Sequence, residues 1–258
     1  MHGVGPRHRV SVMAWLEENG AVCREEYEVK TYDCTPRRTM SVTALLRWAA
    51  ELADVHLGKF DLSYEQLNRM GMVFLLTAVE VRIQRLPAMR ERGTIATWHR
   101  GTDRVRFLRD TELCDAQGNR LATCSSEWVL VDPENHKIKR PSCLPELERV
   151  PMRDCDALSE VPPLRLPADM TLAGERRVNY ADLDYNGHLN NTKYADILSD
   201  WVPGGLQGGY FTRVRIDFQG EARQGEVLRI STAVEGEQRY VSAVHERGKC
   251  FSAVCEIE

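Results

Sequence analysis

The 258-residue chain lacks the marks of several protein classes. Its eight cysteines form no CxxC pair, and no grouping of cysteine and histidine has the spacing of a zinc site, so we predict no metal and no cofactor. We expect the cysteines to be free thiols in a reducing cytoplasm. No apolar run approaches the ~18 residues that a membrane-spanning helix needs. The formal net charge of −4 disfavours nucleic acid as the main partner.

Hydrophobic residues make up 43% of the chain and charged residues 28%, as in a globular protein. Near the N-terminus, a short apolar stretch follows basic residues in RHRVSVMAWLEENG. This stretch turns acidic at once and lacks a small-residue cleavage site, which disfavours a signal peptide. We therefore expect residues 1–20 to be a loosely ordered leader.

The remaining sequence repeats one plan twice. When Asp33 is aligned with Asp182, Thr39 falls on His188 and Trp48 falls on Ile197. Each segment runs from a short strand through a polar turn into a helix with apolar residues at i, i+3, i+4 and i+7. Both halves then continue as an antiparallel meander, with hairpin turns at DAQGN and ERG.

This order predicts an α+β fold of tandem hotdog domains, each a long helix wrapped by a curved antiparallel sheet. We place the N-terminal hotdog at 21–140, a proline-rich linker at 141–172 and the C-terminal hotdog at 173–258. Pairing the two sheets edge to edge would remove exposed strand edges and form a pseudo-dimer within one chain. A monomeric pseudo-dimer and a homodimer of such chains both remain open.

Polar side chains crowd into DLDYNGHLNN, just before the second helix. Asp184, Asn186 and His188 alternate, and in an extended segment this spacing directs all three side chains to one side. The first turn of a helix has free backbone N–H groups that can bind a developing oxyanion. The expected donors are Leu189, Asn190 and Asn191.

A purely structural interpretation competes with a functional one. Asp182 and the asparagines that follow the histidine could simply cap the helix or close a turn. The matching positions of the first half hold Thr35, Arg37 and Thr39, so the turn is repeated without its Asp, Asn and His. The fold alone therefore does not demand these three residues, and we expect the second half to carry the site.

The motif DLDYNGHLNNTKY resembles the signature of acyl-acyl-carrier-protein (acyl-ACP) thioesterases, bacterial and plant enzymes that release fatty acids during their synthesis. The segments TIATWHRGTDRVRFLRD, GNRLATCSSEWVLVD and IDFQGEARQGEVL resemble further strands of that family, so the resemblance covers nearly the whole chain. It places the catalytic Asp, Asn and His on Asp184, Asn186 and His188, and an acidic catalytic residue on Glu221. Plant members have a cysteine next, where this chain has Ala222.

The resemblance implies hydrolysis of fatty acyl-ACP by water, with Glu221 or Asp184 as general base. It also implies that the first hotdog helps to hold the acyl chain, for which Trp48 and Phe74 are the expected lining residues. Acidic acyl carrier protein would be steered by a basic rim. The residues expected to contribute to this rim are Arg37, Arg38, Arg104, Arg106, Lys137, Lys139 and Arg140.

Three other functions remain open. The first is an acyl-CoA or aryl-CoA thioesterase of the hotdog superfamily. The second is a hotdog dehydratase that acts on 3-hydroxyacyl carrier protein, and the third is a lipid-binding module without catalytic activity. An assay for hydrolysis separates the third from the others, and carrier preference separates the first from an acyl-ACP enzyme.

Overall fold

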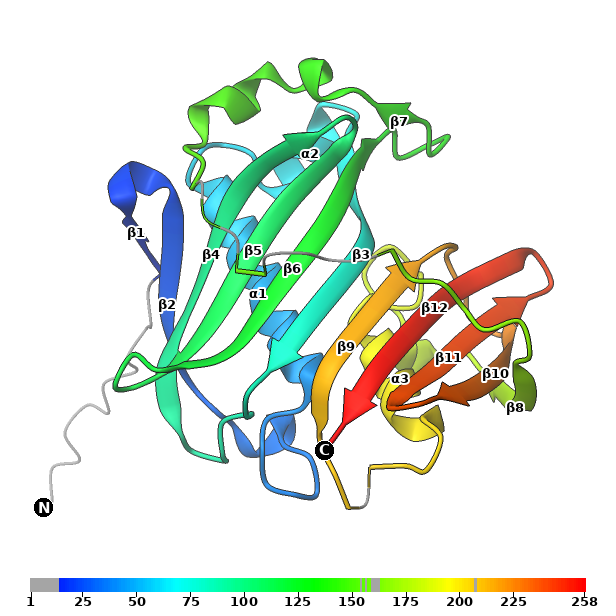
Figure 1. The fold of residues 1–258 in the computed structure, drawn as a ribbon. Coiled ribbons are helices and arrows are strands. Elements are labelled where there is room, and N and C mark those ends of the chain that lie inside the picture. Colours follow the sequence, from blue (N-terminus) through cyan, green and yellow to red (C-terminus); the bar gives the residue numbers. More distant parts are fainter. Residues whose placement is uncertain (1–13, 154, 156, 159–162, 207) are drawn as a thin grey trace, which may run out of the picture.

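The computed structural model describes residues 14–153, 155, 157–158, 163–206 and 208–258. Its strands form one 12-stranded antiparallel sheet in the order β1-β2-β4-β5-β6-β3-β9-β12-β11-β10-β8, with the short strand β7 added to β6. Helix α1 lies against the sheet of the first half and α3 against that of the second (Figure 1). Among the described residues, no helix is long and apolar enough to cross a membrane.

The first half is a hotdog domain in which one long helix packs against five strands in the order β2-β4-β5-β6-β3. Its elements are β2 (Val22–Glu28), α1 (Val42–Gly58), α2 (Tyr64–Arg69), β3 (Val73–Ile83), β4 (Arg92–Asp103), β5 (Arg106–Asp115), β6 (Arg120–Val131) and β7 (Ile138–Lys139). Helix α1 begins where the Ser41 side chain accepts a hydrogen bond from the Ala44 N–H at 3.0 Å. Leu45 and Leu52 on its inner side are fully buried.

The second half repeats this arrangement with strands in the order β8-β10-β11-β12-β9. Its elements are β8 (Thr171–Arg177), α3 (Lys193–Trp201), β9 (Phe211–Phe218), β10 (Val227–Glu235), β11 (Gln238–His245) and β12 (Gly248–Ile257). The halves join where β3 pairs with β9, and Val81 pairs with Val214, its counterpart in the repeated VRI motif. The predicted tandem hotdog fold and its intrachain pseudo-dimer are therefore confirmed.

The predicted leader and linker contain more regular structure than their sequence indicates. Residues 1–13 of the leader lie outside the described residues, while the rest includes β1 (Trp15–Glu17), which pairs with β2, and η1 (Glu18–Gly20). The linker contains η3 (Pro141–Cys143) and η4 (Pro145–Arg149). Leu144, between these two helices, and Val150, just after η4, are buried against the first domain.

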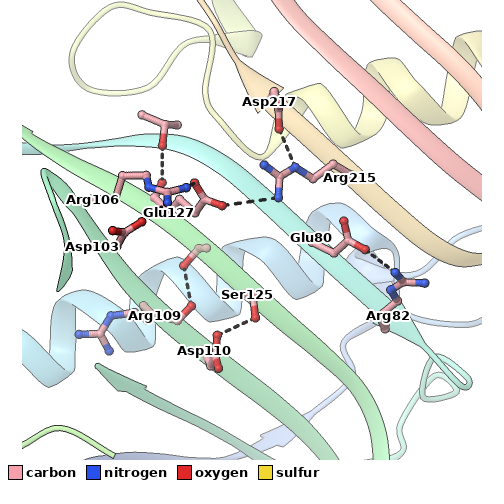
Figure 2. A network of polar contacts seen from close by, with 12 residues as sticks. Glu80, Arg82, Asp103, Arg106, Arg109, Asp110, Ser125, Glu127, Arg215 and Asp217 are labelled. Atoms are coloured by element: carbon pink, nitrogen blue, oxygen red, sulfur yellow. Dashed lines mark hydrogen bonds and ion pairs between the residues drawn. The ribbon is translucent and has the colours of Figure 1, made fainter. Parts of the chain in front are cut away.

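Buried ion pairs fasten the two halves together at the central strands. Arg213 of β9 donates from Nε to Glu80 Oε1 of β3 at 2.8 Å, and the Glu80 side chain is fully buried. Figure 2 shows Arg215 of β9 between Glu127 and Asp217, with nitrogen–oxygen distances of 3.7 and 2.6 Å. Removing one partner of such a pair leaves an uncompensated charge. These contacts hold β9 firmly against the first domain, and β9 leads directly into the loop of Glu221.

Candidate active site

The segment that carries the polar motif is a closed turn between Leu183 and Leu189, which form an isolated bridge. Asp184 N–H donates to His188 O at 2.8 Å, and Gly187 N–H donates to Asp184 O at 3.0 Å. Gly187 has φ +78°, a left-handed conformation that favours glycine. The expectation of an extended segment with side chains alternating to one side is therefore wrong, because the chain reverses direction within it.

The Asp184 side chain organises this turn. Its Oδ1 accepts hydrogen bonds from the backbone N–H groups of Asn186 at 2.8 Å and His188 at 3.2 Å. Such an aspartate turn replaces backbone pairing that the tight loop cannot provide. The carboxylate is thus engaged by the polypeptide itself, and it fixes where Asn186 and His188 point.

A second loop brings Glu221 to the turn. Leu189 N–H donates to Ala222 O at 2.8 Å, and His188 and Arg223 form an isolated bridge. As a result, His188 Nε2 lies 3.3 Å from Glu221 Oε2, and each side chain is 25% exposed. The two residues that the sequence identified from separate motifs therefore meet in space, at a position that water can reach.

The backbone of Glu221 is held from behind by the hairpin of β11 and β12. Its carbonyl oxygen accepts from Arg247 Nη2 at 2.7 Å and lies 3.1 Å from His245 Nε2. Arg247 N–H donates to His245 Nδ1, so Nε2 carries the proton and donates to the carbonyl. Arg247 also binds Glu226, and this hydrogen bond lowers the pKa of Glu226 to about 2. The loop is therefore fixed by charged groups outside the site.

Two residues of the first domain complete the site, and the sequence analysis missed both. Tyr64 of α2 donates its hydroxyl to Asn186 Oδ1 at 2.7 Å, and its ring meets Tyr185 edge to face at 5.0 Å. His136, in the loop before β7, has its Nδ1 3.7 Å from Glu221 Oε1. Glu221 thus lies between one histidine from each half. No motif surrounds Tyr64 or His136, because the domain pairing alone brings them here.

Of the three backbone N–H groups that were expected to be free to bind an oxyanion, two are already paired within the protein. Leu189 N–H is paired with Ala222 O, and Asn190 N–H donates to Asp182 O at 2.9 Å, so the prediction is wrong for both donors. In the described part of the chain, Asn191 N–H donates no hydrogen bond. Asn190 instead closes the turn before α3, since its Oδ1 accepts from the Thr192 N–H at 2.9 Å and the Thr192 hydroxyl at 2.8 Å.

A cavity of about 630 Å³ opens beside this turn, inside the first domain between α1 and the sheet. Phe74 lines it and packs edge to face on Phe107, with ring centroids 5.0 Å apart. Trp48 does not line this cavity, because its half-buried ring packs against Tyr27 at the edge of the core. The turn and the residues that lead from it into α3 contribute to the lining of the cavity. They are Asp184, Tyr185, Asn186, Asn190, Asn191 and Thr192.

The site resembles neither a metal centre nor a cysteine nucleophile. No group of three or more His, Cys, Asp or Glu side chains in the described residues could hold a metal ion. All eight cysteines are free. Cys250, which accepts backbone hydrogen bonds from the loop before Glu221, is fully buried, and burial raises the pKa of its thiol to about 11. It is therefore held as a thiol, the form that is a poor nucleophile.

Each half of the fold matches a domain of one known protein family. Residues 20–143 match the N-terminal domain model of acyl-ACP thioesterases, and residues 168–250 match the C-terminal domain model. The chain belongs to the acyl-ACP thioesterase family. The resemblance drawn from the sequence motifs is confirmed, and it holds for both domains.

Two plant enzymes are relatives of low sequence identity. The chain is 23% identical to an oleoyl-acyl carrier protein thioesterase of Arabidopsis thaliana, over 93% of the chain and 70% of that protein. It is 22% identical to a dodecanoyl-[acyl-carrier-protein] hydrolase of Cinnamomum camphora, over 84% of the chain but 61% of that protein. The chain therefore spans about 60 to 70% of the length of these two relatives.

Solved structures share the whole fold. A 12:0-ACP thioesterase from Umbellularia californica superposes with a TM-score of 0.82 at 18% identity, covering 92% of this chain and 97% of the other. An acyl-ACP thioesterase from Bacteroides thetaiotaomicron gives a TM-score of 0.79 at 17% identity, covering 94% and 100%. At this identity the likeness establishes the acyl-ACP thioesterase architecture across both hotdog domains.

Proposed function

We propose that this protein hydrolyses fatty acyl-ACP thioesters to a free fatty acid and holo-ACP. The observation that carries the proposal is the pairing of Glu221 with His188 beside a large cavity, in a chain of the acyl-ACP thioesterase family. The acyl chain enters the cavity of the first domain, and the thioester lies across the turn of the second. The reaction takes place in the cytoplasm, where free thiols stay reduced.

Glu221 acts as the general base. A thioester is activated enough for direct attack by water, so the carboxylate needs only to remove one proton as the oxygen approaches the carbonyl carbon. His188 and Asn186 orient this water, and His136 limits the movement of the other Glu221 oxygen. Asp184 is a poor base by comparison, because two backbone N–H groups already bind its Oδ1.

The tetrahedral intermediate places a negative charge on the former carbonyl oxygen. Asn191 N–H is unpaired among the described residues and lines the cavity, so it is our choice of oxyanion donor. One such donor lowers the barrier by roughly 3–4 kcal/mol. Collapse of the intermediate breaks the carbon–sulfur bond. The leaving thiolate then takes up the proton that Glu221 removed from the water, which returns Glu221 to its ionised form.

The carrier protein approaches over the loop that holds His136. Lys137 on this loop and Arg140 just after β7 are exposed, and within the described part of the chain neither forms an ion pair. Lys139 is paired with Asp132 at 3.3 Å, and Arg106 is held by Glu127 at 2.9 Å. We therefore assign the contact with the acidic carrier mainly to Lys137 and Arg140, while Arg37 and Arg38 belong to the equivalent turn of the first half.

Thiol release from matched acyl-ACP and acyl-CoA substrates, with chains from six to eighteen carbons, tests this function. A clear preference for acyl-ACP substrates supports the proposal, and the same panel shows which acyl chain length is preferred. A preference for CoA would move the protein to the other thioesterase class. No hydrolysis of either substrate would overturn the proposal.

A further inference from the structure

The cavity beside the turn contains a buried cation. Arg109 of β5 lines the cavity and is only 7% exposed. Figure 2 shows its guanidinium extending from β5 towards α1. It also lines a smaller cavity of about 50 Å³ that shares Ala50, Trp128 and Asn191 with the large one. The cation therefore lies where the two cavities adjoin, near the proposed oxyanion donor.

The recorded partners of this guanidinium are neutral. Arg109 Nη1 lies 3.1 Å from His56 Nδ1 and donates to the Thr97 hydroxyl at 3.3 Å. Since arginine can only donate, His56 Nδ1 accepts, and the proton sits on Nε2, 2.9 Å from Gly20 O. Among the described residues, no ion pair with a carboxylate and no hydrogen bond from Nε or Nη2 is recorded for Arg109.

Neighbouring carboxylates do not neutralise this charge at contact distance. Asp110 follows Arg109 on the strand and faces the opposite side of the sheet. There it accepts from the Ser125 hydroxyl at 2.6 Å and from the Ala157 N–H at 2.8 Å. The carboxylates of the cavity lining occupy exposed or half-buried positions. They are Glu51, Asp54, Glu65 and Asp184.

A plain hydrocarbon chain fits the part of the cavity around Arg109 poorly. It would displace water from the guanidinium and leave Nε and Nη2 facing methylene groups, and a buried donor without an acceptor is costly. The surrounding walls are apolar, with Phe107 and Trp128 beside the arginine. An oxygen atom on the chain would satisfy the free donors while the remainder contacted the apolar wall.

We propose that the preferred acyl group carries a further acceptor oxygen, as an oxo, hydroxyl or carboxylate group, and that Arg109 binds this oxygen. The inference rests on the proposed thioester hydrolysis and narrows its substrate class from fatty acyl to oxygenated fatty acyl. His99, which pairs with Arg109 across β4 and β5, lines the same cavity. Burial lowers the pKa of His99 to about 4, so the ring adds a neutral polar group rather than a second cation.

Binding of unreactive esters tests this preference without hydrolysis. Isothermal titration calorimetry is run with methyl decanoate, methyl 3-oxodecanoate, methyl 3-hydroxydecanoate and monomethyl decanedioate. At least one oxygenated ester is expected to bind roughly tenfold or more tightly than methyl decanoate, and which one does so locates the oxygen on the chain. Equal or tighter binding of methyl decanoate than of all three would overturn the inference.

Two substitutions separate a binding role of Arg109 from a structural one. Arg109→Met keeps an unbranched apolar stem and removes the donors, so it is expected to abolish the preference while methyl decanoate still binds. Arg109→Lys retains a cation and is expected to keep part of the preference. A folded Arg109→Met protein with the full preference for the oxygenated ester would contradict the assignment. The wild-type comparison decides the matter if the methionine variant does not fold.

Turnover of the corresponding acyl-ACP substrates distinguishes failure of this inference from failure of the proposed function. Hydrolysis of decanoyl-ACP at the same kcat/KM as its oxygenated analogues would leave the thioesterase function in place and remove the inference. Selective ester binding without hydrolysis of any acyl-ACP would leave the polar pocket in place and remove the function.

Discussion

The hydroxyl of Tyr64, in the first hotdog domain, donates a 2.7 Å hydrogen bond to Asn186 Oδ1, in the second. Together with the 3.7 Å approach of His136 to Glu221, this contact makes the site a product of both domains. The half without the Asp, Asn and His motif therefore supplies more than the cavity. It also fixes the orientation of a side chain within the motif.

The Tyr64→Phe variant tests this contact. Loss of one hydrogen bond to an amide costs about 1 kcal/mol, so we expect kcat to fall about fivefold to tenfold while the fold is retained. The measurement is steady-state hydrolysis of the best acyl-ACP. Tyr180→Phe is the matched control, since Tyr180 is 79% exposed and outside the site. Equal activity of the two variants would remove Tyr64 from the positioning of Asn186.

Glu221→Gln separates base catalysis from structure. The amide keeps the shape of the carboxylate but cannot accept a proton, so kcat should fall by about 10²- to 10⁴-fold. Glu226→Gln on the same loop is the control, because its carboxylate binds Arg247 rather than the water site. Circular dichroism checks the fold of both. Near-wild-type turnover by folded Glu221→Gln would eliminate this residue as the base.

Asp184 is expected to act mainly on the stability of the turn. Asp184→Ala removes the acceptor of two backbone N–H groups, and we expect a loss of about 2 kcal/mol in the free energy of unfolding. Asp184→Asn keeps an acceptor oxygen and should restore most of that stability. Thr35→Ala, at the equivalent position of the first half, is expected to cost less than about 1 kcal/mol. Urea denaturation measures all three, and equal losses at both turns would contradict this role.

The repeat in the sequence correctly predicted that both halves share one turn before their helix, although it did not predict that the chain reverses between Leu183 and Leu189. Asp33 and Asp182 are both buried, and their carbonyl groups accept from the N–H groups of Ser41 and Asn190 at 2.9 Å each. These positions follow from the alignment because each turn must end one strand and begin one helix. In both halves the fold requires the same local hydrogen bonds, so the pattern of residue types preserves them.

Contacts that depend on tertiary structure were beyond the reach of the sequence. Leu189 N–H stood out as a free helix donor, but the neighbouring loop occupies it through Ala222 O. Trp48 has the apolar character of a cavity residue, yet the rotation of α1 turns it towards Tyr27. Arg109 alternates with neighbours on an ordinary strand, and its burial becomes visible only when α1 covers that face.

The buried histidine that accepts from Arg109 predicts how stability changes with pH. Burial, aided by the Arg109 charge, lowers the pKa of His56 to about 4, whereas an unfolded chain has a histidine pKa of about 6.5. As pH falls below about 6.5, the unfolded state therefore binds a proton that the folded state does not. The neutral His56 therefore makes its full contribution to the stability of the folded state above about pH 6.5. This contribution declines continuously as pH falls towards about 4.

His56→Gln removes this proton while its amide retains one donor and one acceptor for Gly20 and Arg109. Between pH 6 and 5 the free energy of unfolding of the wild type should fall by up to about 1.4 kcal/mol per pH unit for each such histidine. His99, with its pKa also lowered to about 4, contributes in the same direction. When the free energy of unfolding from urea denaturation is plotted against pH, the slope for the variant should therefore be smaller by the contribution of one proton. Carboxylates contribute to this slope mainly at lower pH. An identical slope would mean that His56 does not titrate differently in the two states, and that the buried Arg109 does not hold it neutral.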